Sequence, residues 1–274
     1  MTIIFARSRH VYDSYLDFWQ LVELSGFPVC HVDECDLTQD VVYVTSLVNR
    51  EWDALIQAYE GRPRRAHLIL WNLERPDGWA GGSVGSYGLR CWRMLHQRHF
   101  DEIWVSDRRL ASETELRFVV LGSHPGLGTP GIVEKQYDFC HMSVKTNRRQ
   151  SIYKHFDNIG PNCWPPQRDA VLKASRFALN VHQDRHPFQE PLRFALFAAY
   201  GLPILTEDIY DSFPWGTSTM FYSPYPGIVR RMKDLLKEDY DKCARVGLRA
   251  HHLMCEDLTF GKCVRQAVKE SLER

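Results

Sequence analysis

The sequence lacks several features that would place it at once in a simple functional class. Its 34 basic and 34 acidic side chains cancel, so no overall field attracts nucleic acid or an anionic membrane. No stretch approaches the roughly 20 apolar residues of a membrane-spanning helix. The opening "MTIIFARSRH" has a shorter apolar run than the roughly 7–15 residues of a secretory signal. We therefore expect a cytoplasmic protein without a membrane span.

The cysteines provide no recognisable metal or disulfide pattern. There are eight, they are dispersed, and none forms a CxxC pair. This usage indicates reduced, mostly buried thiols. Cys243 and Cys255 lie near His251 and His252 in sequence, but the spacing matches no standard zinc ligand set. The acidic stretch "VDECD" (32–36) comes early and reads as a loop, so we expect that the protein requires neither a metal nor a cofactor.

The sequence does contain a regular alternation of strand and helix patterns. Its 274 residues suffice for two modest domains, at about 150 residues each. Runs that are apolar on both faces indicate parallel sheets covered by helices on both sides. In the first half we predict strands at 2–5, 28–32, 41–47, 66–71, 102–106 and 116–122, and helices at 14–26, 50–61 and 89–100.

A segment rich in glycine and proline, "SHPGLGTPGIVEKQ" (123–136), is the best linker candidate. After it we predict strands at 138–144, 177–182, 202–205 and 219–223, and helices at 149–156, 167–176, 191–200, 227–238 and onward to the C-terminus. The fold class is therefore α/β, with two doubly wound, Rossmann-like domains. We place them at 1–130 and 131–250, followed by a C-terminal helix at 251–274.

The linker also contains a GxGxxG pattern, at Gly126, Gly128 and Gly131. A dinucleotide-binding fingerprint requires a helix to begin at the third glycine, so that the helix N-terminus meets the pyrophosphate. Pro130 interrupts the pattern, and the chain then continues toward a strand. We interpret the segment as a turn-rich hinge, and an NAD-dependent oxidoreductase is the less favoured alternative.

A basic turn follows the first strand of the second half, in "YDFCHMSVKTNRR". The strand exits through Ser143 and the chain turns over Asn147, and the next helix begins with Arg148 and Arg149. Guanidinium groups beside the free N–H groups of a helix start suit a diphosphate. The alternative is a basic turn that is merely solvated.

A second polar group precedes the helix in "HPFQEPLRFALFAAYG". Pro191 suits the first helical turn, so Gln189 and Glu190 lie at the rim of the sheet. Glu190 is suited to accept hydrogen bonds from sugar hydroxyls; the alternatives are a helix cap and an ion pair with Arg193. His182 ends the preceding strand and exits toward the same rim.

These two segments carry a resemblance to a known family. "ALNVHQDRHPFQEPLRFALFAAYGLPILTED" and "SVKTNRR" resemble the nucleotide-sugar-binding C-terminal domain of glycosyltransferases with two Rossmann-like domains, the GT-B fold, and in particular the retaining group 1, family 4-like members. The resemblance covers about residues 136–240. It implies two domains facing a cleft, a last helix that returns toward the first domain, and a nucleoside diphosphate sugar as donor. Ser143, Asn147, Arg148, Arg149, His182, Gln189 and Glu190 would then form the donor site.

The sequence departs from that family at one position. Retaining members commonly carry two glutamates eight positions apart across this helix, and the second position falls at the apolar Leu196. Either Glu190 or Glu207 then contacts the ribose, or the donor is held in another way. The stereochemistry of transfer stays open.

Candidates in the first half are the polar residues after predicted strands: Ser8, Arg9, His10, Asn72, Glu74, Arg75, Ser106 and Asp107. An inverting transfer needs a base at the acceptor hydroxyl, and we select Glu74 and His10 as the ionisable groups for that catalytic role. The acceptor is a glycan, a small molecule or a modified nucleobase in DNA, and the neutral net charge disfavours DNA. A non-catalytic nucleotide-sugar-binding protein of the same fold is the main alternative function.

Overall fold

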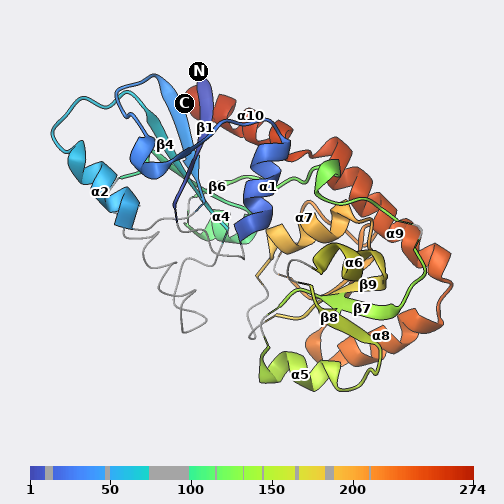
Figure 1. The fold of residues 1–274 in the computed structure, drawn as a ribbon. Helices are drawn as coiled ribbons and strands as arrows, with labels where there is room; N and C mark the ends of the chain where they lie inside the picture. The colour runs from blue at the N-terminus through green and yellow to red at the C-terminus, as the bar shows by residue number, and fades with distance from the viewer. Residues whose placement is uncertain are drawn as a thin grey trace. The chain divides into compact units, whose positions relative to one another are not determined.

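The computed structural model divides the chain into two compact units. It describes residues 1–9, 15–46, 50–73, 99–114, 116–131, 133–143, 145–163, 167–182, 188–209 and 211–274. Unit 1 comprises Met1–Leu121 together with Phe260–Arg274, and unit 2 comprises Gly122–Thr259. The division falls between Leu121 and Gly122, ahead of the predicted boundary at 130/131. Figure 1 shows the strands and helices of each unit.

Unit 1 contains a parallel sheet of six strands within the described residues, in the order β2-β1-β3-β4-β5-β6. The strands are β1 (Thr2–Arg7), β2 (Val29–His31), β3 (Val41–Thr45), β4 (His67–Asn72), β5 (Glu102–Val105) and β6 (Arg117–Phe118). The central strands β3 and β4 are almost completely buried. This burial explains their continuous apolar runs, because a parallel sheet is covered on both faces.

The helices of unit 1 include one from the far end of the chain. They are α1 (Leu16–Leu24), α2 (Arg50–Ala58), α4 (Arg108–Thr114), the 3₁₀ turn η2 (Val32–Glu34) and α10 (Phe260–Leu272). Phe260 of α10 stacks on Trp71 at 5.6 Å between ring centroids and contacts Phe18 at 5.7 Å. The expected return of the last helix to the first domain is therefore confirmed.

Unit 2 contains a second parallel sheet, with five strands among the described residues, in the order β11-β10-β9-β7-β8. The strands are β7 (Tyr137–His141), β8 (Ile159–Asn162), β9 (Ser175–Asn180), β10 (Ile204–Glu207) and β11 (Met220–Ser223). Central strand β9 pairs with both β7 and β10. This order, with strand crossovers through helices, is the doubly wound arrangement predicted for the second half.

The helices of unit 2 pack around this sheet. They are α5 (Asn147–Tyr153), α6 (Arg168–Lys173), α7 (Pro191–Ala199), α8 (Ile228–Lys237) and α9 (Tyr240–His252), followed by a π-helical turn, η6 (Leu253–Asp257). Two 3₁₀ turns, η4 (Pro125–Leu127) and η5 (Tyr225–Gly227), complete the unit. Helix α7 is almost wholly buried from Phe194 to Ala199, which agrees with its apolar sequence.

One strand and one α-helix of the described residues were not predicted from the sequence. Strand β8 contains Gly160 and Pro161, residues that weaken a strand pattern, and it is tolerated because β8 lies at a sheet edge. Helix α4 begins with two arginines and lacks an apolar stripe, but Asp107 accepts a hydrogen bond from the Leu110 amide at its start. Most of the predicted helix at 89–100 lies outside the described residues.

The GxGxxG segment adopts the turn-rich form that we predicted. Pro125–Leu127 form the short turn η4, and the chain then runs to β7. A side chain at Gly128 would overlap the ring of Tyr200, so this glycine serves close packing rather than a phosphate. Among the helices of the described residues, none is both long and apolar enough to cross a membrane.

Candidate functional site

The donor-site residues predicted from the sequence lie along the side of the unit 2 sheet that is formed by the carboxyl ends of its strands. We call this side the carboxyl edge. Strands β7, β9 and β10 are parallel neighbours, so their carboxyl ends meet at the same edge. Helix α5 follows β7 and begins there, and Thr146 caps it by accepting a hydrogen bond from the Arg149 amide at 3.2 Å. Ligands of open α/β sheets bind at this edge.

Arg148 is held at this edge by a carboxylate and an aromatic ring. Its Nη1 donates to Glu207 Oε2 at 2.5 Å, and Nη2 donates to Glu207 Oε1, which makes the pair bidentate. The guanidinium carbon lies 3.6 Å from the centroid of the Tyr225 ring. Nη1 also donates to the His182 carbonyl at 3.2 Å. Arg148 is thereby fixed in one orientation, with 18% of its side chain exposed.

Arg149 lies inside unit 2 rather than at its surface. Its side chain is 2% exposed, and Nε donates to the Val181 carbonyl at 2.8 Å. Its Nη2 lies 3.8 Å from Glu190 Oε1. Burial lowers the pKa of Arg149, and the carboxylate of Glu190 opposes that shift. The two consecutive arginines are therefore in different environments, which their sequence did not reveal.

Glu190 joins Arg149 to Arg193. The Glu190 carboxylate pairs with Arg193 Nη1 across one helical turn, and Arg193 Nη1 also donates to Asn180 Oδ1. The ion pair between Glu190 and Arg193, an alternative that the sequence raised, is thus confirmed. Because the Glu190 side chain is 24% exposed, it is the member of this group that solvent reaches most easily.

His182 and Gln189 flank this group. The His182 amide donates to Glu207 Oε2 at 2.6 Å, and the ring Nε2 lies 3.1 Å from the Asp208 carbonyl oxygen. Both side chains are nearly buried. Gln189 Nε2 donates to the Phe213 carbonyl at 3.5 Å. Both residues therefore contact the segment that follows β10, His182 through Asp208 and Gln189 through Phe213.

Ser143 belongs to a hydrogen-bonded chain just below the rim. Its Oγ lies 3.0 Å from His141 Nδ1 and 3.1 Å from the Tyr153 hydroxyl, and its amide donates to Asn162 Oδ1 at 3.0 Å. The side chains of His141, Ser143 and Tyr153 are buried. Asn147, at the first position of α5, is exposed. Ser143 therefore supports the turn into α5, whereas Asn147 is open to solvent.

The arginines at this edge suit an anionic ligand. Arg148, Arg149 and Arg193 lie with Glu190 and Glu207, and the exposed Asp208, directly after β10, brings the negative charges to three as well. Arginine is suited to bidentate binding of phosphate. The exposed Lys145 adds a further positive charge to the same turn.

Ser8 and Arg9, at the end of β1 in unit 1, contact Glu51 from the first turn of α2. Ser8 Oγ donates to Glu51 Oε2 at 2.9 Å, and the Arg9 amide donates to the same oxygen at 3.2 Å. Arg9 Nη2 forms an ion pair with Asp33 at 2.9 Å. The sequence did not identify Glu51, although its acidic position beside a helix start was a signal.

The other candidate residues of unit 1 either hold the fold together through hydrogen bonds and burial or lie outside the described residues. Ser106 accepts a hydrogen bond from Trp71 Nε1 at 2.9 Å and donates to the Val119 carbonyl. Asp107 caps α4, and Asn72 is buried at the end of β4. The predicted catalytic residues His10 and Glu74, and also Arg75, belong to segments that the structure does not describe.

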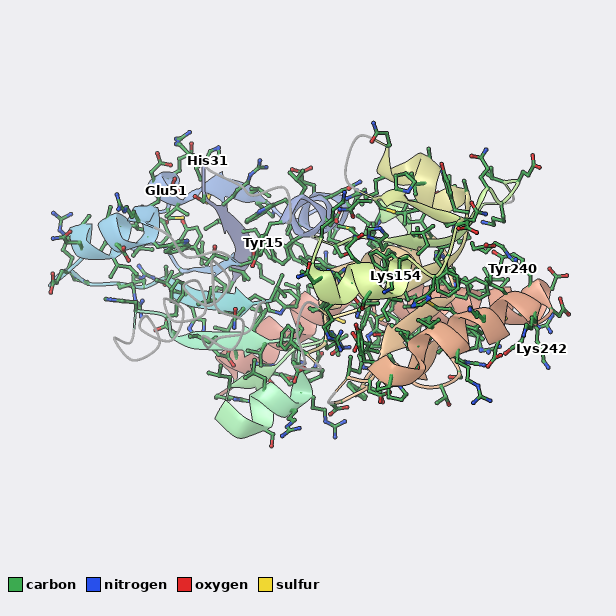
Figure 2. All side chains as sticks on the ribbon, turned by 90° about the horizontal axis from the view of Figure 1, so that it is seen from below. Tyr15, His31, Glu51, Lys154, Tyr240 and Lys242 are labelled. Carbon is green, nitrogen blue, oxygen red and sulfur yellow. The ribbon has the colours of Figure 1, made fainter. Side chains whose placement is uncertain are left out.

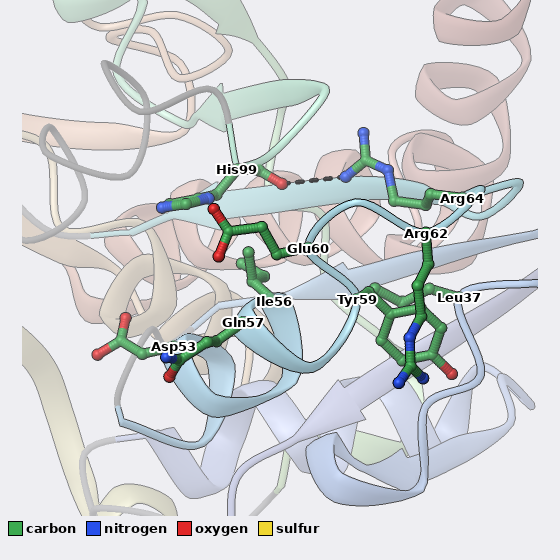
Figure 3. Close-up of a pocket in the computed structure, with 9 residues that line it drawn as sticks. All are labelled: Leu37, Asp53, Ile56, Gln57, Tyr59, Glu60, Arg62, Arg64 and His99. Carbon is green, nitrogen blue, oxygen red and sulfur yellow. Dashed lines mark hydrogen bonds between the residues drawn. The ribbon is translucent and has the colours of Figure 1, made fainter.

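A pocket of about 530 Å³ lies beside the later turns of α2 in unit 1. Figure 3 shows Asp53 and Glu60 on one side of it and Arg62 on the other. Arg64 donates to the His99 carbonyl at 3.1 Å across its upper rim. The pocket is lined by side chains of both charges. It adjoins the residues that precede β4, so it lies away from the carboxyl ends of the strands of unit 1.

Two contributors to the edge of unit 2 were missed or only partly anticipated. Tyr225 was not singled out, yet its ring stacks on Arg148 and its hydroxyl donates to the Arg148 carbonyl at 2.9 Å. Glu207 was considered only as a ribose ligand, whereas here it holds Arg148 and His182. Leu196 is fully buried on α7, as expected for an apolar residue in place of a polar ligand.

Solved structures share this fold at low sequence identity. The chain is similar to Anabaena HepE, solved in complex with UDP and glucose, with a TM-score of 0.65 and 10% identity over 98% of this chain and 99% of that chain. It is also similar to sucrose-phosphate synthase from Thermosynechococcus elongatus, with a TM-score of 0.61 and 9% identity over 100% of this chain and 99% of that chain.

A third similar structure is an alpha-glucosyltransferase in complex with UDP and a 13-mer DNA that contains a central A:G mismatch. Its TM-score is 0.61, at 9% identity over 99% of each chain. Neither a family model nor a curated protein matches the chain. The chain therefore has the α/β fold of GT-B glycosyltransferases, with one parallel sheet in each unit.

Proposed function

We propose that the protein is a glycosyltransferase that moves a sugar from a nucleoside diphosphate sugar to an acceptor hydroxyl. The observation that carries the proposal is the arginine-rich edge of unit 2, at the carboxyl ends of β7, β9 and β10. Two of the three similar structures contain UDP, which makes a uridine diphosphate sugar the first donor to test.

In this proposal Arg148 contacts the donor diphosphate. It is the more exposed of the two consecutive arginines, and Glu207 and Tyr225 already orient its guanidinium. Charge develops on the leaving diphosphate as the glycosidic bond breaks, and a pre-oriented guanidinium stabilises it. Arg149 acts from inside the unit by holding Glu190 in place, with Ser143 and Asn147 shaping the turn.

Glu190, Gln189 and His182 are assigned to the hydroxyl groups of the donor ribose or sugar. Glu190 is the partly exposed carboxylate of the group, so it can exchange one arginine contact for a sugar hydroxyl. The acceptor is assigned to residues of unit 1. Glu74 and His10 remain our proposed acceptor-side base or orienting group, because an inverting transfer requires one. We propose that no metal is required, because arginines supply the positive charge.

Substitution of Arg148 tests the donor site. Arg148→Ala should weaken UDP binding by about tenfold to a hundredfold, the loss expected for hydrogen bonds to a charged group. Isothermal titration calorimetry measures this change, after a thermal-shift screen of uridine, guanosine, adenosine and thymidine diphosphate sugars has identified the donor.

Arg176 provides a matched control. It also pairs with a carboxylate, Asp138 at 3.5 Å, and its guanidinium lies over the Tyr240 ring, but it sits at the start of β9, at the opposite edge of the sheet. Arg176→Ala should leave UDP affinity unchanged. Equal affinities for the wild type and Arg148→Ala would remove Arg148 from the donor site. Donor binding without transfer or hydrolysis across a broad acceptor panel would instead favour the non-catalytic alternative.

A further inference from the structure

Two cysteines of unit 1 lie with their sulfur atoms in contact. Cys30 is in β2, the edge strand of the sheet, and Cys35 directly follows the 3₁₀ turn η2. Their Sγ atoms are 3.6 Å apart. A disulfide requires about 2.05 Å, so the two sulfurs need to approach by only about 1.5 Å.

The backbone between these cysteines is already closed into the required turn. The His31 amide donates to Glu34 Oε2 at 2.8 Å, and the Cys35 amide donates to the Val32 carbonyl at 3.2 Å. Figure 2 labels His31 in this turn. A disulfide would therefore form with little additional ordering of the chain, since the loop is closed in the reduced protein.

The environments of the two sulfurs differ. Cys30 is partly exposed, whereas Cys35 is 5% exposed and packs in the core of unit 1. Contact with the other thiol lowers the pKa of Cys30, a shift that burial and the carboxylates of Glu34 and Asp33 oppose. The same contact together with burial raises the pKa of Cys35. The thiolate is the reactive form of cysteine, so the accessible sulfur is also the more nucleophilic one.

We propose that Cys30 and Cys35 form a peroxide-reactive dithiol, in which Cys30 is the attacking and Cys35 the resolving residue. The Cys30 thiolate attacks one oxygen of a hydroperoxide, the O–O bond breaks, and Cys30 sulfenic acid forms as hydroxide or alkoxide leaves. Cys35 Sγ then attacks the sulfenic sulfur, and the S–O bond breaks. The displaced hydroxide departs with the Cys35 proton as water. The peroxide is reduced and both sulfurs are oxidised.

The disulfide would lie beside charged residues that this turn presents. Asp33 and Glu34, between the two cysteines, hold Arg9 at 2.9 and 3.7 Å. Arg9 in turn contacts Glu51 through its backbone amide. Oxidation would therefore change the turn that holds Arg9, two residues after the end of β1.

Peptide mapping of the intact protein tests the proposal without any substitution. Hydrogen peroxide should produce a peptide pair linked through Cys30 and Cys35, with the loss of two hydrogen atoms, and a dithiol reductant should reverse it. Cys140 and Cys163 serve as the internal control. Both are fully buried and hydrogen-bonded to backbone carbonyls, so the native protein should not link them under the same treatment.

A trapping experiment tests the order of attack. In a background with Cys91→Ser and Cys263→Ser, adding Cys35→Ser should leave a dimedone-reactive sulfenic acid on Cys30, whereas adding Cys30→Ser should leave Cys35 unlabelled. Cys91 lies outside the described residues, and Cys263 is partly exposed, so both are removed. Absence of the linked peptide in the wild type, or equal labelling of the two variants, would overturn the proposal.

Discussion

At the residue scale, His141 is the buried titratable group with the clearest consequence for stability. It ends β7, its ring stacks on Tyr153 at 4.4 Å between centroids, and its Nδ1 lies 3.0 Å from Ser143 Oγ. Burial, together with the positive charges of Arg149, Arg193 and Lys145, lowers the pKa of His141 to about 4. The ring is therefore neutral in the folded protein at pH 5, where an unfolded chain would carry a proton on it.

This difference predicts that the protein loses stability on mild acidification. Between pH 6.5 and about 4 the unfolded state binds the His141 proton and the folded state does not, so the free energy of unfolding falls as the pH falls. Through His141 alone, the free energy of unfolding should be about 3 kcal/mol lower near pH 4 than above pH 6.5. Urea unfolding at pH 7 and pH 5 measures the change.

The His141 ring also allows a direct measurement. Its titration, followed by NMR, should have a midpoint near 4, well below the ordinary histidine value of about 6.5. The variant His141→Phe should reduce the pH dependence of stability, because it removes the group whose pKa differs between the folded and unfolded states. A His141 midpoint near 6.5 would contradict the prediction.

Residue spacing predicted some of the contacts at the carboxyl edge of the unit 2 sheet, but it did not predict how deeply the side chains are buried. Glu190 and Arg193 are three positions apart on a predicted helix start, which places them on one face. The burial of Arg149 was also detectable in principle, because Ile152 and Tyr153, three and four positions later, are buried on the same face of α5. Tyr225 could not be assigned, because its contact with Arg148 joins segments distant in sequence.

At the element scale, α9 packs against the turn between α7 and β10 through a glycine. A Cβ atom at Gly247 would overlap the Gly201 carbonyl oxygen and lie 2.5 Å from the Pro203 nitrogen. Gly201 itself has φ +63°, a left-handed conformation that suits glycine at the end of α7. The close approach of two backbones therefore fixes both residues as glycine.

Gly247→Ala should consequently destabilise unit 2. Alanine favours a helix interior by about 1 kcal/mol over glycine, but the clash with backbone atoms costs about 1–3 kcal/mol or more, because neither segment can move aside easily. We expect a net loss in chemical denaturation. Gly216→Ala is the control, because nothing lies within 4 Å of its added methyl group. A gain in stability for Gly247→Ala would show that α9 does not pack as closely as described.

The elements themselves were predicted where local signals were strong. Strands β3 and β4 have continuous apolar runs, and α7 has a proline at its start and a glycine after its end. Strand β8 was missed because Gly160 and Pro161 disfavour a strand locally, and pairing with β7 overrides that preference. Helix α4 was missed because it is short and begins with two arginines, so it shows no apolar periodicity.

At the scale of the whole molecule, unit 1 is made from both ends of the chain. The alternation of strands and helices predicted two α/β halves, but only the family resemblance predicted that the last helix returns. Nothing in the local sequence of α10 specifies its partner. The physical reason for the return is Phe260, fully buried among the rings of Phe5, Phe18 and Trp71.

Phe260→Ala should therefore destabilise unit 1, although residue 260 follows directly after unit 2. Removing a fully buried phenylalanine costs about 3–5 kcal/mol, because contacts with four aromatic rings are lost and a cavity remains. Hydrogen exchange resolved by residue should show faster exchange in β1 and β4 and no change in β9 and β10. Leu272→Ala, on the same helix but 44% exposed, is the control and should alter stability by less than about 0.5 kcal/mol. Equal acceleration in both sheets would mean that the units unfold as one, and that α10 stabilises the molecule rather than unit 1 alone.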